Sequence, residues 1–72
     1  MQKVPISTEY IKLDALLKFS GIAQTGGQAK EMIAAGQVRV NGESCAMRGK
    51  KLRPGDTVSA AGAEIEVCKG EG

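Results

Sequence analysis

An Asn-Gly dipeptide at positions 41 and 42 constrains the fold of this chain more than any other feature of its sequence. Asn-Gly suits the tight turn of a β-hairpin, because both residues tolerate the positive φ angles that such a turn needs. Val38 and Val40 precede it and alternate around Arg39, which is the pattern of a half-buried strand. The chain is therefore predicted to turn back here, with a second strand through residues 43–47.

The rest of the second half repeats this alternation. Strands are predicted over residues 57–60 and 64–67, joined at Ala61-Gly62. Pro54-Gly55-Asp56 predicts a turn before the first of them, since proline and glycine suit the φ angles of a turn. The second half is thus expected to form antiparallel strands.

The first half has the spacing of helices instead. Apolar residues recur at helical spacing over residues 13–19, and Gly21 supplies an end. Thr25 followed by Gln28 fits a capping box at the start of a second helix, which Gly36 ends. The sequence therefore predicts an α+β fold of two short helices packed on a small curved antiparallel sheet.

The domain boundaries follow from the same patterns. Seventy-two residues make one domain and leave no room for a second. Residues 1–7 are expected to form a short N-terminal leader, in which Pro5 discourages regular structure. Residues 8–68 would form the single domain, starting with a short strand, and residues 69–72 a polar C-terminal tail.

Composition excludes several classes of function. The chain has no histidine, and Cys45 and Cys68 lack the spacing of a metal site, so neither a metal nor a cofactor is expected. Without histidine or paired carboxylates, catalysis is not expected either. Tyr10 and Phe19 are the only aromatic residues, which argues against recognition by aromatic stacking.

Location is inferred from what the chain lacks. No apolar run approaches the ~20 residues of a membrane span, and the N-terminus has no signal-peptide pattern. A cytoplasmic protein with two reduced thiols is therefore predicted, and one disulfide between them is the less favoured alternative.

Cationic residues gather in one segment. The net charge is only +2, but four of the six residues from Arg48 to Arg53 are cationic. Repulsion among close cations is relieved when they neutralise phosphates and release the counterions condensed on a nucleic acid, so the segment suits nucleic acid. A solubilising surface loop has the same pattern. Arg39 is expected on the face opposite the core, either solvated or in contact with a partner.

The helical half could extend this basic face. Lys12 and Lys18 flank the first helix, and Lys30 lies near the start of the second, where the helix dipole disfavours a cation. Gly26 and Gly27 would let a phosphate approach the free N–H groups of that helix. They fit a tight entry turn equally well.

One ordered set of residues spans most of the chain, from about Tyr10 to Val67. It comprises Lys12-Leu13-Asp14, Leu17, Gly21, Ala23, Thr25, Ala29-Lys30, Ile33, Gly36, Val38, Val40-Asn41-Gly42 and Pro54-Gly55-Asp56. At these spacings the set resembles the S-four-type RNA-binding domain, also called the αL motif. The runs Thr-Gly-Gly-Gln-Ala-Lys and Arg-Gly-Lys-Lys are similar to those of its small free-standing bacterial group.

The resemblance implies a domain that binds structured RNA, such as ribosomal or transfer RNA, in ribosome function or translation. A monomer is expected, because nothing in the sequence demands a larger assembly. In one departure, larger family members often place an arginine after the second helix cap, where this chain has Gly26. An RNA contact from that arginine is therefore not expected here, and RNA binding is expected to depend on the other cations. The residues expected to bind RNA are Lys12, Lys18, Thr25, Gly26, Gly27, Gln28, Lys30, Arg39, Arg48, Lys50, Lys51 and Arg53.

Two other functions are considered. A protein–protein adaptor is compatible with the same features. A ubiquitin-like sulfur carrier fits the chain length and the Pro-Gly-Asp turn near a C-terminal strand. Such carriers end in Gly-Gly, however, and this sequence ends in Gly70-Glu71-Gly72.

Overall fold

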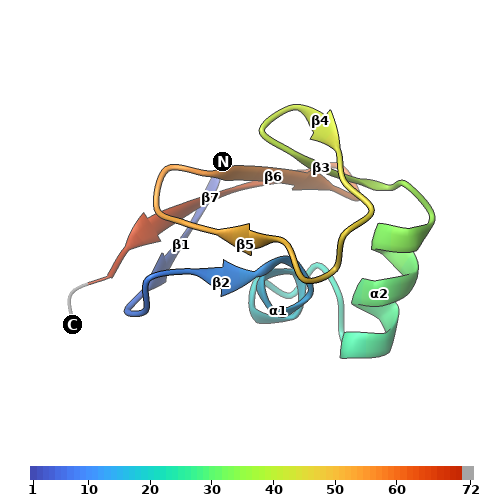
Figure 1. The fold of residues 1–72 in the computed structure, drawn as a ribbon, viewed down its shortest axis with the longest axis horizontal. Coiled ribbons are helices and arrows are strands. Elements are labelled where there is room, and N and C mark those ends of the chain that lie inside the picture. Colours follow the sequence, from blue (N-terminus) through green and yellow to red (C-terminus); the bar gives the residue numbers. More distant parts are fainter. Residues whose placement is uncertain (71–72) are drawn as a thin grey trace.

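The computed structural model describes residues 1–70, which form two helices and seven strands in two sheets (Figure 1). The larger sheet has the strand order β1-β7-β6-β3-β4, and β2 pairs with β5 in the smaller one. The predicted α+β class is confirmed. The elements are β1 (Gln2–Ile6), β2 (Ile11–Lys12), α1 (Leu13–Phe19), α2 (Gly26–Ala34), β3 (Val38–Val40), β4 (Glu43–Ser44), β5 (Lys51–Leu52), β6 (Thr57–Ala60) and β7 (Ala63–Lys69).

Both predicted hairpins are present. Asn41 and Gly42 have φ angles of 52° and 85° and join β3 to β4. Ala61 and Gly62 join β6 to β7 in the same way, with φ angles of 53° and 77°. Strand β4 ends at Ser44 rather than reaching residue 47, because the chain leaves the sheet there to reach the start of α1.

The N-terminal segment differs from its prediction. Residues 2–6 form β1, which runs parallel to β7 with Val4 opposite Val67, so the expectation that Pro5 prevents regular structure is wrong. The carbonyl of Ile6 accepts a hydrogen bond from Gly70 N–H at 2.7 Å. Because the backbone groups of successive residues in a strand point to opposite edges, the nitrogen of Pro5 faces the open edge of the sheet. Proline therefore removes no hydrogen bond between β1 and β7.

Strand β1 also changes the character of the sheet. Because β1 and β7 are parallel, the sheet is mixed, whereas an antiparallel one was expected. Val4 and Ile6 are buried in the core, so the segment expected to be a leader contributes to the folded unit. The expected polar tail begins at Lys69, which is still the last residue of β7. Glu71 and Gly72 lie outside the described residues.

The ends of α2 form as predicted. The N–H of Gln28 donates to Thr25 Oγ1 at 3.0 Å, and Gln28 Oε1 accepts from Gln24 N–H at 2.7 Å. The side chain of Gln28 thus binds the backbone of Gln24, one residue before the N-cap residue Thr25. At the other end, Gly36 has a φ of 75° and its N–H donates to Ile33 at 3.1 Å, as expected of a glycine that ends a helix.

One face of the large sheet and the elements that cover it enclose a single core. Burying a large aliphatic side chain contributes about 1.5–3 kcal/mol, so this core is the main source of stability. Arg39 and Ser59, which are partners across β3 and β6, lie on the other face of the sheet. The core residues are Val4, Ile6, Leu13, Leu16, Leu17, Ala23, Ala29, Ile33, Val38, Val40, Leu52, Val58, Ala60, Ile65 and Val67.

Candidate nucleic-acid interface

The β2–β5 pair brings two lysines together. Lys12 and Lys51 are direct partners in its antiparallel register, and both side chains are exposed. Directly opposed residues project from the same face of a strand pair, and like charges placed this way destabilise it. An anion bound between the two ammonium groups would remove that repulsion.

Tyr10 positions one of these lysines. The ammonium Nζ of Lys51 lies 4.9 Å from the centroid of the Tyr10 ring, within the range of a cation–π contact. The backbone carbonyl of Tyr10 in turn accepts a hydrogen bond from Thr8 Oγ1 at 2.8 Å. The Tyr10 ring therefore offers the Lys51 ammonium group a favourable position on this face.

The basic segment is attached to the start of α1. The N–H groups of Leu13 and Asp14 donate to the carbonyls of Lys50 and Arg48, at 2.9 and 3.2 Å. Lys12, the N-cap residue, makes no side-chain capping bond. The loop backbone thus satisfies N–H groups that a helix leaves open at its start. As a result, Arg48 and Lys50 are fixed next to Lys12 with their side chains exposed.

The prediction of one continuous loop over residues 48–53 is corrected at β5. Leu52 is fully buried in the core, and this burial holds Lys51 against β2. Arg53 follows directly, and its N–H donates to Asp56 Oδ2 at 2.8 Å. An apolar residue surrounded by cations was the sequence signal for this strand. We call Lys12, Arg48, Lys50, Lys51 and Arg53 the basic surface.

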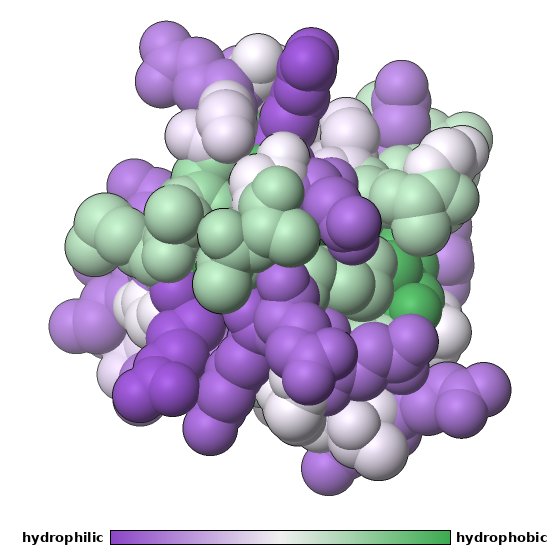
Figure 2. Space-filling model, turned by 90° about the vertical axis from the view of Figure 1, so that its right-hand side faces the viewer, coloured by the Kyte–Doolittle hydropathy of each residue, from purple (hydrophilic) through white to green (hydrophobic). Residues whose placement is uncertain are grey.

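The candidate RNA-binding residues on the two helices lie next to the basic surface, because α1 contacts both α2 and β2. Lys18 lies in the last turn of α1 and Lys30 on α2, and both are exposed. Figure 1 shows α2 at one end of the molecule, and Figure 2 shows that this end is largely hydrophilic, with a band of apolar residues across it.

Residues at the start of α2 have different roles. Thr25 and Gln28 use their side-chain oxygens in the helix cap. Gly26 and Gly27 are the first two helical residues, and neither has a positive φ angle. Apart from the adjacent residues and the backbone of the helix itself, no atom lies within 4 Å of a Cβ built on Gly26, and the nearest one for Gly27 is Thr25 Oγ1 at 3.9 Å. The backbone therefore does not require glycine here.

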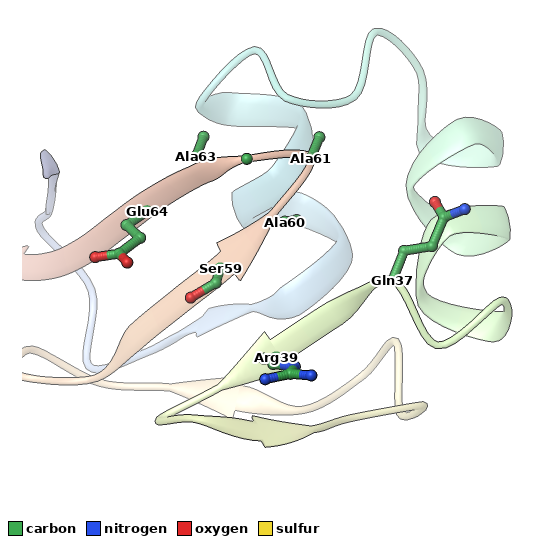
Figure 3. A pocket seen from close by; sticks show the side chains of 8 residues that line it. Gln37, Arg39, Ser59, Ala60, Ala61, Ala63 and Glu64 are labelled. Atoms are coloured by element: carbon green, nitrogen blue, oxygen red, sulfur yellow. The ribbon is translucent and has the colours of Figure 1, made fainter.

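Arg39 is not brought together with the basic surface. It lies on the open face of the large sheet, opposite Ser59 of β6, as its alternation with two valines predicted. It lines a shallow hollow of about 360 Å³. Figure 3 shows Arg39 with Gln37 and Glu64, which also line this hollow. The carboxylate of Glu64 makes this hollow less attractive to phosphate than the basic surface.

Other features of the described chain bear on metal and membrane chemistry. Cys45 and Cys68 are free and half-buried. Among residues 1–70, no three His, Cys, Asp or Glu side chains are grouped to hold a metal ion. Over the same residues, neither helix is long and apolar enough to span a bilayer.

Fold and surface together define a small α+β module with a basic strand pair attached to a helix start. Residues 4–68 match the model of the S4 domain, and the chain belongs to the S4 domain family. It is 41% identical over 58 residues to YbcJ of Escherichia coli (strain K12), covering 81% of this chain and 83% of that protein. It is also 41% identical over 59 residues to RlbA of Bacillus subtilis (strain 168), named a probable ribosome maturation protein, covering 82% and 83%.

A solved structure agrees with the fold. The solution structure of YbcJ from E. coli, described as revealing an αL motif involved in RNA binding, superposes with a TM-score of 0.68 at 36% identity. The superposition covers 93% of this chain and 84% of YbcJ. The resemblance inferred from the sequence is therefore confirmed.

Sequence reasoning missed two parts of this region. It did not predict the β2–β5 pair, whose only signals are the two-residue strand at Ile11 and the isolated Leu52. It also missed a second hollow beside Met47, an exposed side chain in an irregular segment. Irregular segments lack the periodicity from which exposure can be predicted.

Proposed function

We propose that this protein binds structured RNA through the basic surface, without catalysing a reaction. The observation that carries the proposal is the direct opposition of Lys12 and Lys51, next to a cationic loop whose backbone is tied to α1. A solubilising loop would not need its cations fixed in pairs. The described αL motif of YbcJ and the name of RlbA support the same function.

The binding energy would come mainly from phosphates. Each phosphate neutralised by a lysine or arginine releases counterions, so affinity falls as salt rises, with a log–log slope of about −0.7 to −0.9 per contact. The major groove of double-stranded RNA is too deep and narrow for side chains to read, so contacts with the backbone, the 2′-hydroxyls and the overall shape dominate its recognition. A compact set of five cations fits such a backbone contact.

The helical residues would form a second contact region. Lys18, Lys30 and the N–H groups of Gly26 and Gly27 could meet another stretch of the same RNA. Thr25 and Gln28 would act indirectly, by holding the helix start. Arg39 would contribute least, because it lies on the other face of the large sheet.

Several finer points belong to this proposal. We propose ribosomal or transfer RNA as the partner, a role in ribosome function or translation, a monomeric state and a cytoplasmic location. Residues 1–70 would act as one unit, since the core includes both β1 and β7. Family membership favours this role over a ubiquitin-like sulfur carrier.

The first experiment measures binding to a ribosomal RNA fragment, a transfer RNA and duplex DNA over a salt series. The wild-type protein should prefer folded RNA. The double variant Lys50→Glu with Lys51→Glu should bind more weakly and with a flatter salt slope, because two phosphate contacts are lost.

A matched double variant controls for net charge. Lys3→Glu with Lys69→Glu makes the same charge change on β1 and β7, away from the basic surface, and should keep most of the affinity. Circular dichroism checks that both variants fold. Equal losses in the two double variants would mean that net charge alone drives binding. If neither variant loses affinity, the basic surface is not the RNA site.

An adaptor role is the second candidate. It is favoured by Phe19, whose side chain is 68% exposed at the end of α1. Phe19→Ala should then abolish capture of a protein partner while leaving RNA affinity unchanged.

A further inference from the structure

A small hollow adjoins the basic surface. It has a volume of about 200 Å³ and lies between the β3–β4 hairpin and the loop that leads to β5. Lys50 belongs both to the hollow and to the basic surface. A phosphate bound to Lys50 would therefore lie beside this hollow.

The walls of the hollow are held by backbone hydrogen bonds. The N–H of Cys45 donates to the Val38 carbonyl at 3.0 Å, which fixes the wall on the hairpin side. The N–H of Lys50 donates to the Met47 carbonyl at 3.1 Å and closes a tight turn between these residues. Lys50 is also tied to α1 through its carbonyl, so the hollow exists before a partner binds.

The lining combines apolar and polar groups. Val40, Cys45 and Met47 supply its apolar part, and the Met47 side chain is 66% exposed. The exposed side chains of Glu43 and Ser44 supply polar groups on the hairpin side. A thioether is polarisable and makes favourable contacts with aromatic rings, so Met47 can pack against a flat heterocycle.

We infer that this hollow receives one unpaired base of the bound RNA while Lys50 contacts the adjoining phosphate. The inference rests on the proposed RNA-binding function and deepens it. Proteins read RNA sequence mainly at unpaired bases, which can leave the helix and enter a pocket. Ligand pockets for larger molecules usually measure about 300–1,000 Å³, so this smaller hollow suits a single ring system.

Glu43 narrows the choice of base. A carboxylate accepts hydrogen bonds only, and in nucleic acids it pairs with exocyclic amino groups. Asn41 does not compete for the same contact, because its amide is engaged by Thr57 and Asp56. Bases that carry an amino group are therefore expected to fit best, and adenine is a suitable probe.

The test uses three RNA hairpins that differ at one position. One carries a single bulged adenosine, one has an abasic residue at the same bulge, and one is fully paired. The abasic hairpin keeps the phosphate and removes only the base. The wild-type protein should bind the bulged adenosine about 2- to 10-fold more tightly than the abasic hairpin, the range expected of one thioether–ring contact.

Two variants assign the effect to the hollow. Met47→Ala should bind the adenosine and abasic hairpins equally. Phe19→Ala removes an apolar side chain of similar exposure, 68% against 66%, from outside the hollow and should keep the preference. Both residues are exposed, so both variants should fold, which circular dichroism verifies.

The outcomes separate the two proposals. Equal wild-type affinity for the adenosine and abasic hairpins, with RNA binding retained, would overturn the base pocket and leave the basic surface in place. A preference that survives Met47→Ala would also overturn it. Failure to bind any of the hairpins at low salt would overturn the proposed function itself, and the base pocket with it.

Discussion

Lys12 of β2 and Lys51 of β5 are directly opposed across an antiparallel pair, and Lys51 lies 4.9 Å from the ring centroid of Tyr10. Two cations on one face of a strand pair oppose folding, and Lys12 is also the N-cap residue of α1, where the helix dipole disfavours positive charge. This arrangement lowers stability in the free protein and suits a bound phosphate. Stability and RNA affinity should therefore respond in opposite directions when one lysine is removed.

Lys12→Gln should raise the free energy of unfolding by about 0.2–1 kcal/mol at low salt, because it relieves the repulsion from Lys51. The gain should shrink at high salt, since ions screen exposed charges. The same variant should bind RNA more weakly. Urea denaturation at two salt concentrations measures the first effect. Lys69→Gln, on β7 opposite Ile6, is the control and should change neither quantity much. A loss of stability in Lys12→Gln would contradict the argument.

Gly26→Ala distinguishes the two interpretations of the glycines at the start of α2. The position is helical and sterically open, so alanine should raise stability by up to about 1 kcal/mol. If phosphate approaches the helix N–H groups there, the added Cβ should lower RNA affinity. Thermal unfolding and RNA titration measure the two effects.

Ala34→Gly, at the exposed C-terminal end of the same helix, is the matched control for Gly26→Ala. It should lower stability and leave RNA affinity unchanged. Undiminished affinity in Gly26→Ala would remove the helix start from the RNA contact.

Asn41→Ala should lower the free energy of unfolding by about 1–3 kcal/mol, because three exposed hydrogen bonds are lost. Asn41 Oδ1 accepts from the Thr57 N–H at 2.9 Å and from Thr57 Oγ1 at 3.3 Å, and Nδ2 donates to Asp56 at 3.2 Å. Asn41→Gly loses the same bonds but suits the φ of 52°. Asn41→Gly should therefore be more stable than Asn41→Ala by the cost of placing alanine at a positive φ angle, and it should remain less stable than the wild type. Urea denaturation of both variants measures the two parts, and equal stability of Asn41→Ala and wild type would refute the role of the network.

Ala61→Asn should stabilise the protein by about 0.5–1 kcal/mol. Ala61 has a φ of 53° in the β6–β7 turn, a conformation that disfavours alanine but that asparagine tolerates. Ala61→Val should have the opposite effect, because a β-branched side chain fits this conformation worst. Thermal unfolding measures both. A lower melting temperature for Ala61→Asn than for wild type would contradict the expected sign.

Local sequence signals determined the hairpins and helix ends. Each of these features depends on residues only a few positions apart: the turns at Asn41-Gly42 and Ala61-Gly62, the cap formed by Thr25 and Gln28, and the helix end at Gly36. Their φ preferences and short-range hydrogen bonds are properties of the local chain, so they could be predicted without knowing the rest of the fold. The same holds for the placement of Arg39 away from the core, which follows from the alternation of side chains along a strand.

The tertiary structure decided the pairings between distant segments. Strand β1 pairs with β7 from the far end of the chain, and the local effect of Pro5 is overridden because its nitrogen faces an open edge. Likewise, Lys12 and Lys51 meet only because Leu52 is buried and aligns β5 with β2. Pairing of this kind depends on how distant apolar residues share one core, which no short window of sequence contains. The cationic residues of the basic surface could be read from the sequence. The pairing of Lys12 with Lys51 and the hollow beside Met47 arise only from the fold.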